Sequence, residues 1–302
     1  MANLEVKEKN GNIVYQYDFN SLDDFLNELI TKKINHRIFP NPASIQSDYG
    51  FTRTKSFEEA WNLCKYTYDD GYKKFSELVN HIQFKFENTR RYVNTYKPVG
   101  SSVSVPRFLF GIPNNMHSKE LVMDKPIINL YFQYSYSCNI EESQIKNRGI
   151  LTLALINYLE NIKNYNVIFN FFSICENENE LIHINIKLKN KDEKLKVKRC
   201  YFPLVHPSFL RRLDFRADEI IPYLKTNWSF GYGRPLTYEE AKKYIDEGEF
   251  DMNRAIYIST PDELGIYGNN IEEDAKRFID NINQRYEFLK EDEKEKTYAK
   301  RR

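Results

Sequence analysis

The stretch Pro126-Ile-Ile-Asn-Leu-Tyr-Phe-Gln-Tyr-Ser-Tyr-Ser137 opens the part of the sequence that decides the fold. A nearly continuous apolar and aromatic run of this kind is typical of a β-strand that is covered on both faces, in the middle of a sheet. Residues 141–162 then place apolar side chains at steps of three and four, and they begin with Glu141 and Glu142, where a helix dipole favours negative charge. We therefore predict a buried strand followed by a helix with one apolar face.

Two more strands follow this helix. Residues 165–174 are again mostly apolar, and a helix that connects two buried strands implies parallel pairing and a right-handed connection. Residues 181–189 alternate between apolar and polar side chains after a turn too short for a second crossover, so we expect an antiparallel edge strand with one wet face. This order predicts an α/β fold with a mostly parallel sheet, an antiparallel edge strand and flanking helices.

The residues before this core predict a mainly helical region. Helices are expected over 18–30, 57–69 and 72–96, and the second of them begins with the capping-box pattern of Ser56 and Glu59.

Two shorter patterns complete the N-terminal part. The alternation of Ile13, Tyr15 and Tyr17 indicates a short edge strand, and Pro98 within residues 97–104 indicates a linker or exposed loop before the core.

The residues after the core continue the α/β pattern. Residues 195–205 predict another strand, 206–216 a short helix, 254–259 a short buried strand and 270–289 the last long helix, and a charged run follows. We divide the chain accordingly into three parts, which are an N-terminal helical region packed on the core, an α/β core domain and a charged tail: residues 1–100, 101–290 and 291–302.

Composition limits the classes of protein to consider. The chain has 302 residues and a formal net charge of +1, which argues against a general polyanion binder. Its four cysteines lack CxxC or metal-ligand spacing, so we expect buried, reduced thiols. The charged N-terminus and the lack of a long apolar run predict a cytoplasmic protein without a membrane partner.

Five short motifs lie between residues 50 and 220. They are Phe51-Thr-Arg-Thr-Lys-Ser-Phe-Glu-Glu-Ala-Trp61, Asp70-Gly-Tyr72, Gly111-Ile-Pro-Asn-Asn-Met116, Lys146-Asn-Arg-Gly149 and His206-Pro-Ser-Phe-Leu-Arg-Arg212. Together they resemble an uncharacterised family that tailed bacteriophages and related mobile elements encode. No biochemical activity comes with that family, so the resemblance implies an origin, and with it the cytoplasm of a bacterial host.

A second resemblance concerns the fold. The central strand ends in Gln133-Tyr-Ser135-Tyr-Ser137, and with the helix, the second parallel strand and the edge strand it resembles the opening of a von Willebrand factor A-type domain. In that family the turn reads Asp-x-Ser-x-Ser and its oxygens hold a divalent cation. Gln133 replaces the carboxylate, and a neutral amide removes most of the attraction for a hard cation. We therefore expect no metal and no cofactor.

The same turn gives a candidate docking site. In open α/β sheets, ligands bind outside the carboxyl ends of the strands. If the strand over 254–259 is parallel to the central strand and beside it, polar side chains of both strand ends meet at one edge: Gln133, Ser135, Ser137, Thr260 and Asp262. Alternatively, the serines only form the turn and cap the next helix.

A basic segment over 194–216 supports a nucleic-acid surface instead. Dispersed cations suit backbone phosphates, and nearby aromatic residues suit unpaired bases. The candidate cations are Lys196, Lys198, Arg199, Arg211, Arg212 and Arg216. Alternatively, the lysines point outward from an edge strand and the apolar residues among the arginines belong to the core.

Three function classes remain open. A non-enzymatic interaction module, A-type-domain-like and with a protein partner at the strand ends, is favoured because the sequence contains no catalytic constellation. A nucleic-acid-binding accessory protein is the alternative. An enzyme is the least favoured class, since scattered histidines and carboxylates would have to converge in space.

Overall fold

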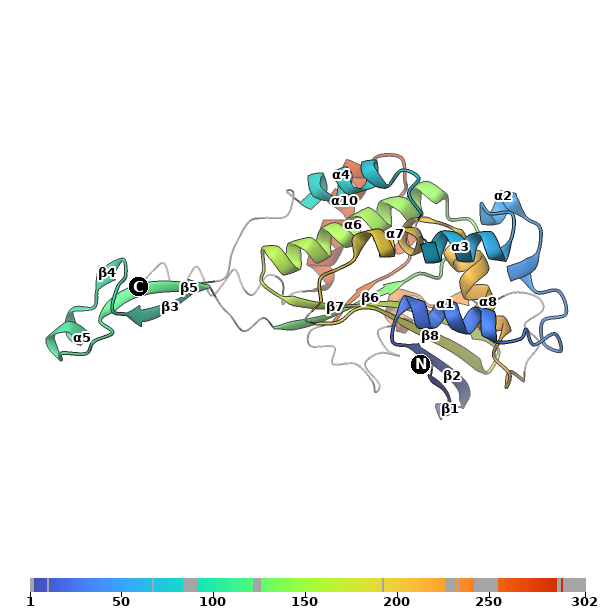
Figure 1. Ribbon diagram of the computed structural model, residues 1–302, viewed down its shortest axis with the longest axis horizontal. Coiled ribbons are helices and arrows are strands. Elements are labelled where there is room, and N and C mark those ends of the chain that lie inside the picture. The colour runs from blue at the N-terminus through green and yellow to red at the C-terminus, as the bar shows by residue number, and fades with distance from the viewer. Residues whose placement is uncertain are drawn as a thin grey trace.

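A computed structural model describes residues 3–9, 11–66, 68–83, 92–121, 126–191, 193–225, 232, 234–241, 255–286 and 289. Within these residues the chain forms one large mixed sheet, helices that cover it, and a small three-stranded sheet that extends away from it (Figure 1). The charged tail predicted over 291–302 lies outside the described residues.

The large sheet contains seven of the described strands. They are β1 (Asn3–Lys9), β2 (Asn12–Phe19), β6 (Ile127–Gln133), β7 (Asn166–Asn177), β8 (Glu180–Lys189), β9 (Arg234–Pro235) and β10 (Ala255–Ile258). Their order is β1-β2-β8-β7-β6-β10, and β9 pairs with the end of β7. The pairs β10–β6, β6–β7 and β2–β8 are parallel, whereas β1–β2, β7–β8 and β7–β9 are antiparallel.

The predicted strand–helix–strand–strand core is confirmed. Helix α6 (Glu142–Asn161) connects the parallel strands β6 and β7, and β8 returns antiparallel to β7. The helix begins with a capping box, in which the Glu141 side chain and the Gln144 side chain each bind the other residue's backbone N–H. The fold class is therefore α/β, as the periodicities of this stretch indicate.

The prediction that β8 is an edge strand is wrong. Strand β2 pairs with it on the side away from β7, so β8 is interior and β1 is the antiparallel edge. The polar side chains of β8 bind within the protein instead of facing water. Asn185 Nδ2 donates to Asp18 Oδ1 at 3.1 Å, and the buried His183 packs edge-on against Phe172.

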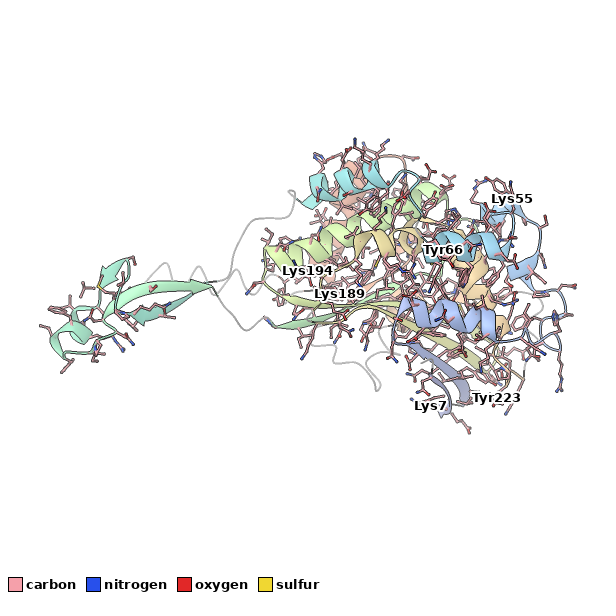
Figure 2. All side chains as sticks on the ribbon, in the orientation of Figure 1. Lys7, Lys55, Tyr66, Lys189, Lys194 and Tyr223 are labelled. Atoms are coloured by element: carbon pink, nitrogen blue, oxygen red, sulfur yellow. The ribbon has the colours of Figure 1, made fainter. Side chains whose placement is uncertain are left out.

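Helices gather on one face of the sheet, where α4, α6 and α7 lie side by side (Figure 1). The remaining described helical segments are α1 (Leu22–Thr31), η1 (Ala43–Ile45), α2 (Tyr49–Thr52), α3 (Phe57–Tyr66), α4 (Tyr72–Gln83), α7 (Val197–Val205), the π-helix η2 (Phe209–Asp214), α8 (Phe215–Glu219), η4 (Asp262–Leu264) and α10 (Ile271–Arg285). Side chains fill the space between helices and sheet (Figure 2). Among the described helices, none is long and apolar enough to cross a membrane.

Several N-terminal expectations hold and others do not. Ser21 caps α1 by accepting the N–H of Asp24 at 3.1 Å, and Ser56 accepts the N–H of Glu59 at 3.1 Å. The N-terminal residues 1–100, however, also contribute β1 and β2 to the large sheet. Three cysteines are buried and free as expected, but Cys138 is exposed.

The predicted strand over 195–205 is wrong, because these residues form α7. Its apolar side chains pack among the helices that cover the sheet, and its main chain passes very close to α6. A Cβ atom on Gly149 of α6 would lie 2.7 Å from the carbonyl oxygen of Leu204, so only glycine fits at this crossing. The nearly continuous apolar run thus reflects a buried helix, which periodicity cannot separate from a buried strand over so short a length.

The region expected to hold a long helix and a linker contains a small sheet. Helix α4 ends at Gln83, and residues 92–121 form β3 (Tyr92–Lys97), β4 (Ser102–Val103), α5 (Val105–Leu109) and β5 (Met116–Leu121) in strand order β3-β5-β4. We call these residues the arm. The boundary predicted at residue 100 falls inside the arm. Of the two alternatives for residues 97–104, the linker is wrong, whereas the mostly exposed turn between β3 and β4 agrees with the exposed loop.

The packing of α6 leads to a first prediction. Leu153 is fully buried, so Leu153→Ala should lower the free energy of unfolding by about 2–5 kcal/mol, through lost burial and the cavity left behind. Urea denaturation measures this loss. The matched control is Leu109→Ala in the arm. Because the Leu109 side chain is 76% exposed, this substitution should lower the free energy of unfolding by less than about 0.5 kcal/mol. Equal losses at the two positions would contradict the assigned burial.

Candidate functional site

The two strand ends proposed as a docking site lie at the same edge of the sheet. Strands β6 and β10 are parallel neighbours, and Phe132 pairs with Ile258 at the carboxyl end of the pair. The turn after β6 and the segment after β10 therefore begin side by side. This part of the expectation is confirmed.

A buried arginine that the sequence analysis did not select connects these ends. Arg148 of α6 donates from one guanidinium nitrogen, Nη1, to the carbonyl oxygens of Gln133 at 2.8 Å and Ser259 at 3.0 Å. Its guanidinium also lies 4.3 Å from the centre of the Phe132 ring. Burial lowers the pKa of Arg148 to about 10, so the side chain remains a cation at neutral pH.

The side chains of the predicted docking set do not form one surface. Gln133 and Ser135 are buried, and the Gln133 amide donates to the Ser135 hydroxyl at 3.1 Å. Ser137 and Asp262 are exposed, and Thr260 is half-buried. Only Ser137, Thr260 and Asp262 can contact a partner directly. The buried pair of Gln133 and Ser135 therefore has a structural role. Within the described residues, no three His, Cys, Asp or Glu side chains are grouped so that they could hold a metal ion.

The arginines of the basic segment bind main-chain carbonyls inside the protein. Arg212 is fully buried and donates to the carbonyl oxygens of Ser44, Gln46 and Thr54, each at 2.9 Å. Arg211 donates from Nη1 to the carbonyl oxygen of Phe51 at 2.7 Å. These guanidinium groups stabilise loops and cannot reach phosphates.

The other cations of this segment are mostly engaged as well. Arg199 donates to the carbonyl oxygen of Lys65 at 2.6 Å and pairs with Asp23 at 2.6 Å. Lys198 pairs with Asp69 at 2.9 Å, and Arg216 donates to the carbonyl oxygen of Leu29 at 3.4 Å.

Lys196 is exposed and has no hydrogen bond or ion pair within the described part of the chain. The six cations therefore do not make a continuous basic surface.

Two buried acids lie one helical turn apart, Asp214 at the end of the π-helix and Asp218 in α8. The Tyr134 hydroxyl donates to Oδ1 of Asp214 at 2.7 Å, but Oδ2 of Asp214 and Oδ2 of Asp218 have no hydrogen-bond partner among the described residues. Burial raises the pKa of Asp214 to about 7, and burial together with the Asp214 charge raises the pKa of Asp218 well above its usual range. At least one carboxyl group of this pair therefore holds a proton at neutral pH.

Among the described residues, the arm presents the most exposed of the large apolar side chains. Phe108, Leu109 and Phe110 are consecutive and are 61%, 76% and 82% exposed. Val99, Val103 and Val105 add to this surface, which we call the arm tip. Six large apolar residues are thus exposed within twelve positions, and exposed apolar groups of this kind are unusual on a protein surface.

The arm tip has a defined shape. The guanidinium of Arg107 lies 4.2 Å from the centre of the Tyr96 ring, and its Nε donates to the carbonyl oxygen of Asn114 at 2.9 Å. Gly111 ends the helical turn with a φ of 68°, a conformation that favours glycine. These contacts hold the apolar residues in place on the outside of the arm.

The arm is also basic. In the sequence, residues 88–119 contain no aspartate or glutamate, and the arm itself, residues 92–121, has three cations, Lys97, Arg107 and Lys119, against one acid, Glu120. The surface around the arm tip therefore attracts acidic groups. Neither the apolar tip nor its isolation from the core was recognised in the sequence, although the acid-free stretch could have indicated it.

The contacts of Arg148 predict a large effect on stability. Arg148→Met should lower the free energy of unfolding by about 3–5 kcal/mol, because two buried carbonyl groups lose their donor. Urea denaturation measures the loss. Arg53→Met, at an exposed arginine, serves as the control and should change stability by less than about 0.5 kcal/mol. A loss no larger than that of the control would contradict the role of Arg148.

The acid pair predicts a pH dependence. The unfolded chain loses the Asp214 proton near the usual pKa of 3.8, whereas the native state keeps it up to about 7. Wild-type stability should therefore fall as pH rises from 4 to 7, by about 1.4 kcal/mol per pH unit for one such proton. Asp214→Asn removes this loss and should gain stability relative to wild type between pH 5 and pH 7.

Urea denaturation at several pH values checks this expectation. Asparagine keeps an oxygen that can accept from Tyr134, so the substitution isolates the effect of the charge. Asp262→Asn, at an exposed acid, is the matched control and should leave the slope unchanged. Parallel profiles for wild type and Asp214→Asn would disprove the assignment.

Comparisons with known proteins place the chain in a family. Residues 6–286 match the model of a family described as Domain of unknown function (DUF7192). Two curated proteins that are similar over 91 residues are the biosynthetic arginine decarboxylases of Prochlorococcus marinus strain MIT 9515 and of its subspecies pastoris strain CCMP1986 / NIES-2087 / MED4, at 31% and 30% identity. The matched segment is 30% of this chain and spans only 13% of each decarboxylase. No solved structure matches the chain. Because the family model covers nearly the whole chain, the protein belongs to the family described as Domain of unknown function (DUF7192).

Proposed function

We propose that this protein is a non-enzymatic interaction module whose arm tip docks into an apolar, acid-rimmed groove of another protein. The observation that carries the proposal is the exposure of Phe108, Leu109 and Phe110 on an arm that stands apart from the sheet (Figure 1). Burying a side chain of this size contributes about 1.5–3 kcal/mol, so the three together supply much of the free energy that specific binding needs.

The chemistry of the arm tip favours a protein over a nucleic acid. Its most exposed side chains are aliphatic or aromatic, and Arg107, the cation nearest to them, is half-buried and held by Tyr96 and Asn114. Phosphate backbones require freely placed cations, which the tip lacks. An apolar groove in a folded protein matches the tip better.

Charge also favours a different protein over a second copy of this chain. Two arms in contact would bring together two copies of a segment that has three cations against one acid. Like charges at an interface disfavour such a pair, whereas acidic groups around a groove favour docking and accelerate it. We therefore propose that the partner is a different protein, with acidic residues around its groove.

Further parts of this proposal rest on the sequence. The motifs between residues 50 and 220 imply an origin in tailed phages or mobile elements, and with it the cytoplasm of a bacterial host. The likeness of the β6–α6–β7 unit to an A-type domain supports a binding role. Ser137, Thr260 and Asp262 remain as exposed groups for a second partner contact at the strand ends.

Site-specific cross-linking tests the proposal. The full chain carries a photoreactive phenylalanine analogue in place of Leu109, or in place of Tyr66, which is 70% exposed on the body. A protein captured from position 109 and not from position 66 is purified and titrated against three forms of the chain. These are the wild type, the arm-tip variant Phe108→Ser/Phe110→Ser and the control Tyr49→Ser/Tyr66→Ser.

We expect the arm-tip variant to bind the captured protein at least about tenfold more weakly, which corresponds to 1.4 kcal/mol, and the control to bind as the wild type does. Tighter binding at low salt would follow from the basic arm. Unchanged affinity of the arm-tip variant would overturn the proposal. So would a cross-link that forms only to a second copy, or one that nuclease treatment removes.

A further inference from the structure

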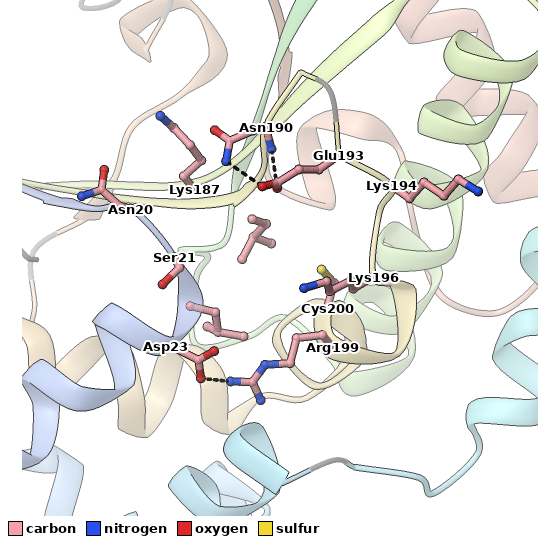
Figure 3. A pocket seen from close by; sticks show the side chains of 12 residues that line it. Asn20, Ser21, Asp23, Lys187, Asn190, Glu193, Lys194, Lys196, Arg199 and Cys200 are labelled. Carbon is pink, nitrogen blue, oxygen red and sulfur yellow. Dashed lines mark hydrogen bonds and ion pairs between the residues drawn. The ribbon is translucent and has the colours of Figure 1, made fainter.

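A pocket of about 190 Å³ lies at a second place where parallel strands end. Strands β2 and β8 form a parallel pair, separate from β6, β7 and β10, and their carboxyl ends open into this pocket. Asn20 and Ser21 follow β2, whereas Leu188 and Asn190 lie at the end of β8, and the start of α7 closes the remaining side (Figure 3). Ligands of α/β proteins bind at such strand ends.

The charged groups around the pocket are unbalanced. Four cations line it, namely Lys187, Lys194, Lys196 and Arg199, against the two acids Asp23 and Glu193.

Both acids already have partners. Asp23 pairs with Lys65 at 2.8 Å and with Arg199 at 2.6 Å, and Glu193 accepts from the backbone and side-chain amides of Asn190, each at 3.2 Å. The bonds from Asn190, with a smaller contribution from Lys196, lower the pKa of the Glu193 carboxyl.

Lys196 is the cation that points into the pocket (Figure 3). Its side chain lies beside Cys200, over an apolar floor to which Leu22 and Leu188 contribute. The Ser21 hydroxyl accepts the Asp24 N–H at 3.1 Å and so keeps its own proton to donate. A bound anion would find one free ammonium group, one hydroxyl donor and a surplus of positive charge at the rim.

We propose that this pocket binds a small, multiply charged phosphate compound. A lysine ammonium group is a common phosphate binder that acts as a point charge. The volume is small for a ligand pocket, which suits a phosphate or diphosphate with a small substituent but not a large cofactor. This inference does not depend on the arm, which contributes no residue to the lining of the pocket.

Titration with pyrophosphate tests the proposal. Calorimetry and thermal melting of the full chain are carried out at matched ionic strength in potassium chloride. The variant is Lys196→Gln, which removes the inward cation. The control is Lys198→Gln, which removes the same charge two residues further along α7, from a lysine that pairs with Asp69.

We expect saturable binding of pyrophosphate to the wild type and to Lys198→Gln, and at least tenfold weaker binding to Lys196→Gln. Inorganic phosphate should bind more weakly than pyrophosphate. The lack of a saturable response beyond that of chloride would overturn the site, and an equal loss in both variants would reduce it to nonspecific charge attraction. Tighter binding of citrate than of pyrophosphate would overturn the phosphate class. The arm-tip variant Phe108→Ser/Phe110→Ser should bind pyrophosphate as the wild type does, so the two proposals can fail separately.

Discussion

The guanidinium group of Arg148 is the contact on which the sheet depends most. Strand β10 has only four residues and joins the described strand order through β6 alone, so few ladder hydrogen bonds hold it. From helix α6, Arg148 adds a bond to the carbonyl oxygen after β10 and one to the end of β6. The adjacent Gly149 lets the main chain of α7 approach the same helix. Two neighbouring residues of α6 thus fix the strand ends below it and the helix beside it.

Buried arginines have the same role elsewhere in the protein. The chain over residues 44–54 contains short helical turns whose carbonyl groups lack regular partners, and Arg212 satisfies three of them from the π-helix. A guanidinium group suits this task because it has five N–H donors in a fixed plane and stays charged when it is buried. The loops around the π-helix are therefore held by hydrogen bonds from side chains to main-chain carbonyl groups. In a sheet, hydrogen bonds between the main chains of neighbouring strands have this role. Asp214 at the end of the same helix and Asp218 in α8 respond to burial differently, because a carboxyl group can retain its proton.

The central part of the fold could be predicted because each of its elements has a long, unambiguous pattern. Helix α6 has twenty residues of helical spacing, and β6 and β7 are buried on both faces. Shorter patterns failed for physical reasons. The apolar run of α7 fits a buried helix as well as a strand, and the polar residues of β8 face protein partners such as Asp18, which spacing alone cannot distinguish from water. The arginines of the candidate nucleic-acid surface failed similarly, since a guanidinium group that binds carbonyls looks the same in sequence as one that binds phosphates. The candidate docking site was correctly placed at one sheet edge, but the inward rotation of Gln133 and Ser135 depends on tertiary packing.

The arm follows a different rule from the rest of the chain. It begins after α4 and returns directly before β6, so the large sheet and its helices can assemble without any residue of the arm. The entropic cost of closing an inserted segment grows only slowly with its length, so the core can tolerate an insertion as long as the arm. Apolar residues at the arm tip then contribute nothing to the hydrophobic core, and leaving Phe108 and Phe110 in water costs solubility without any gain in folding. The fold gives no reason for an apolar tip, and the proposed interaction with another protein would supply one, which is why that proposal rests on the arm and not on the buried residues.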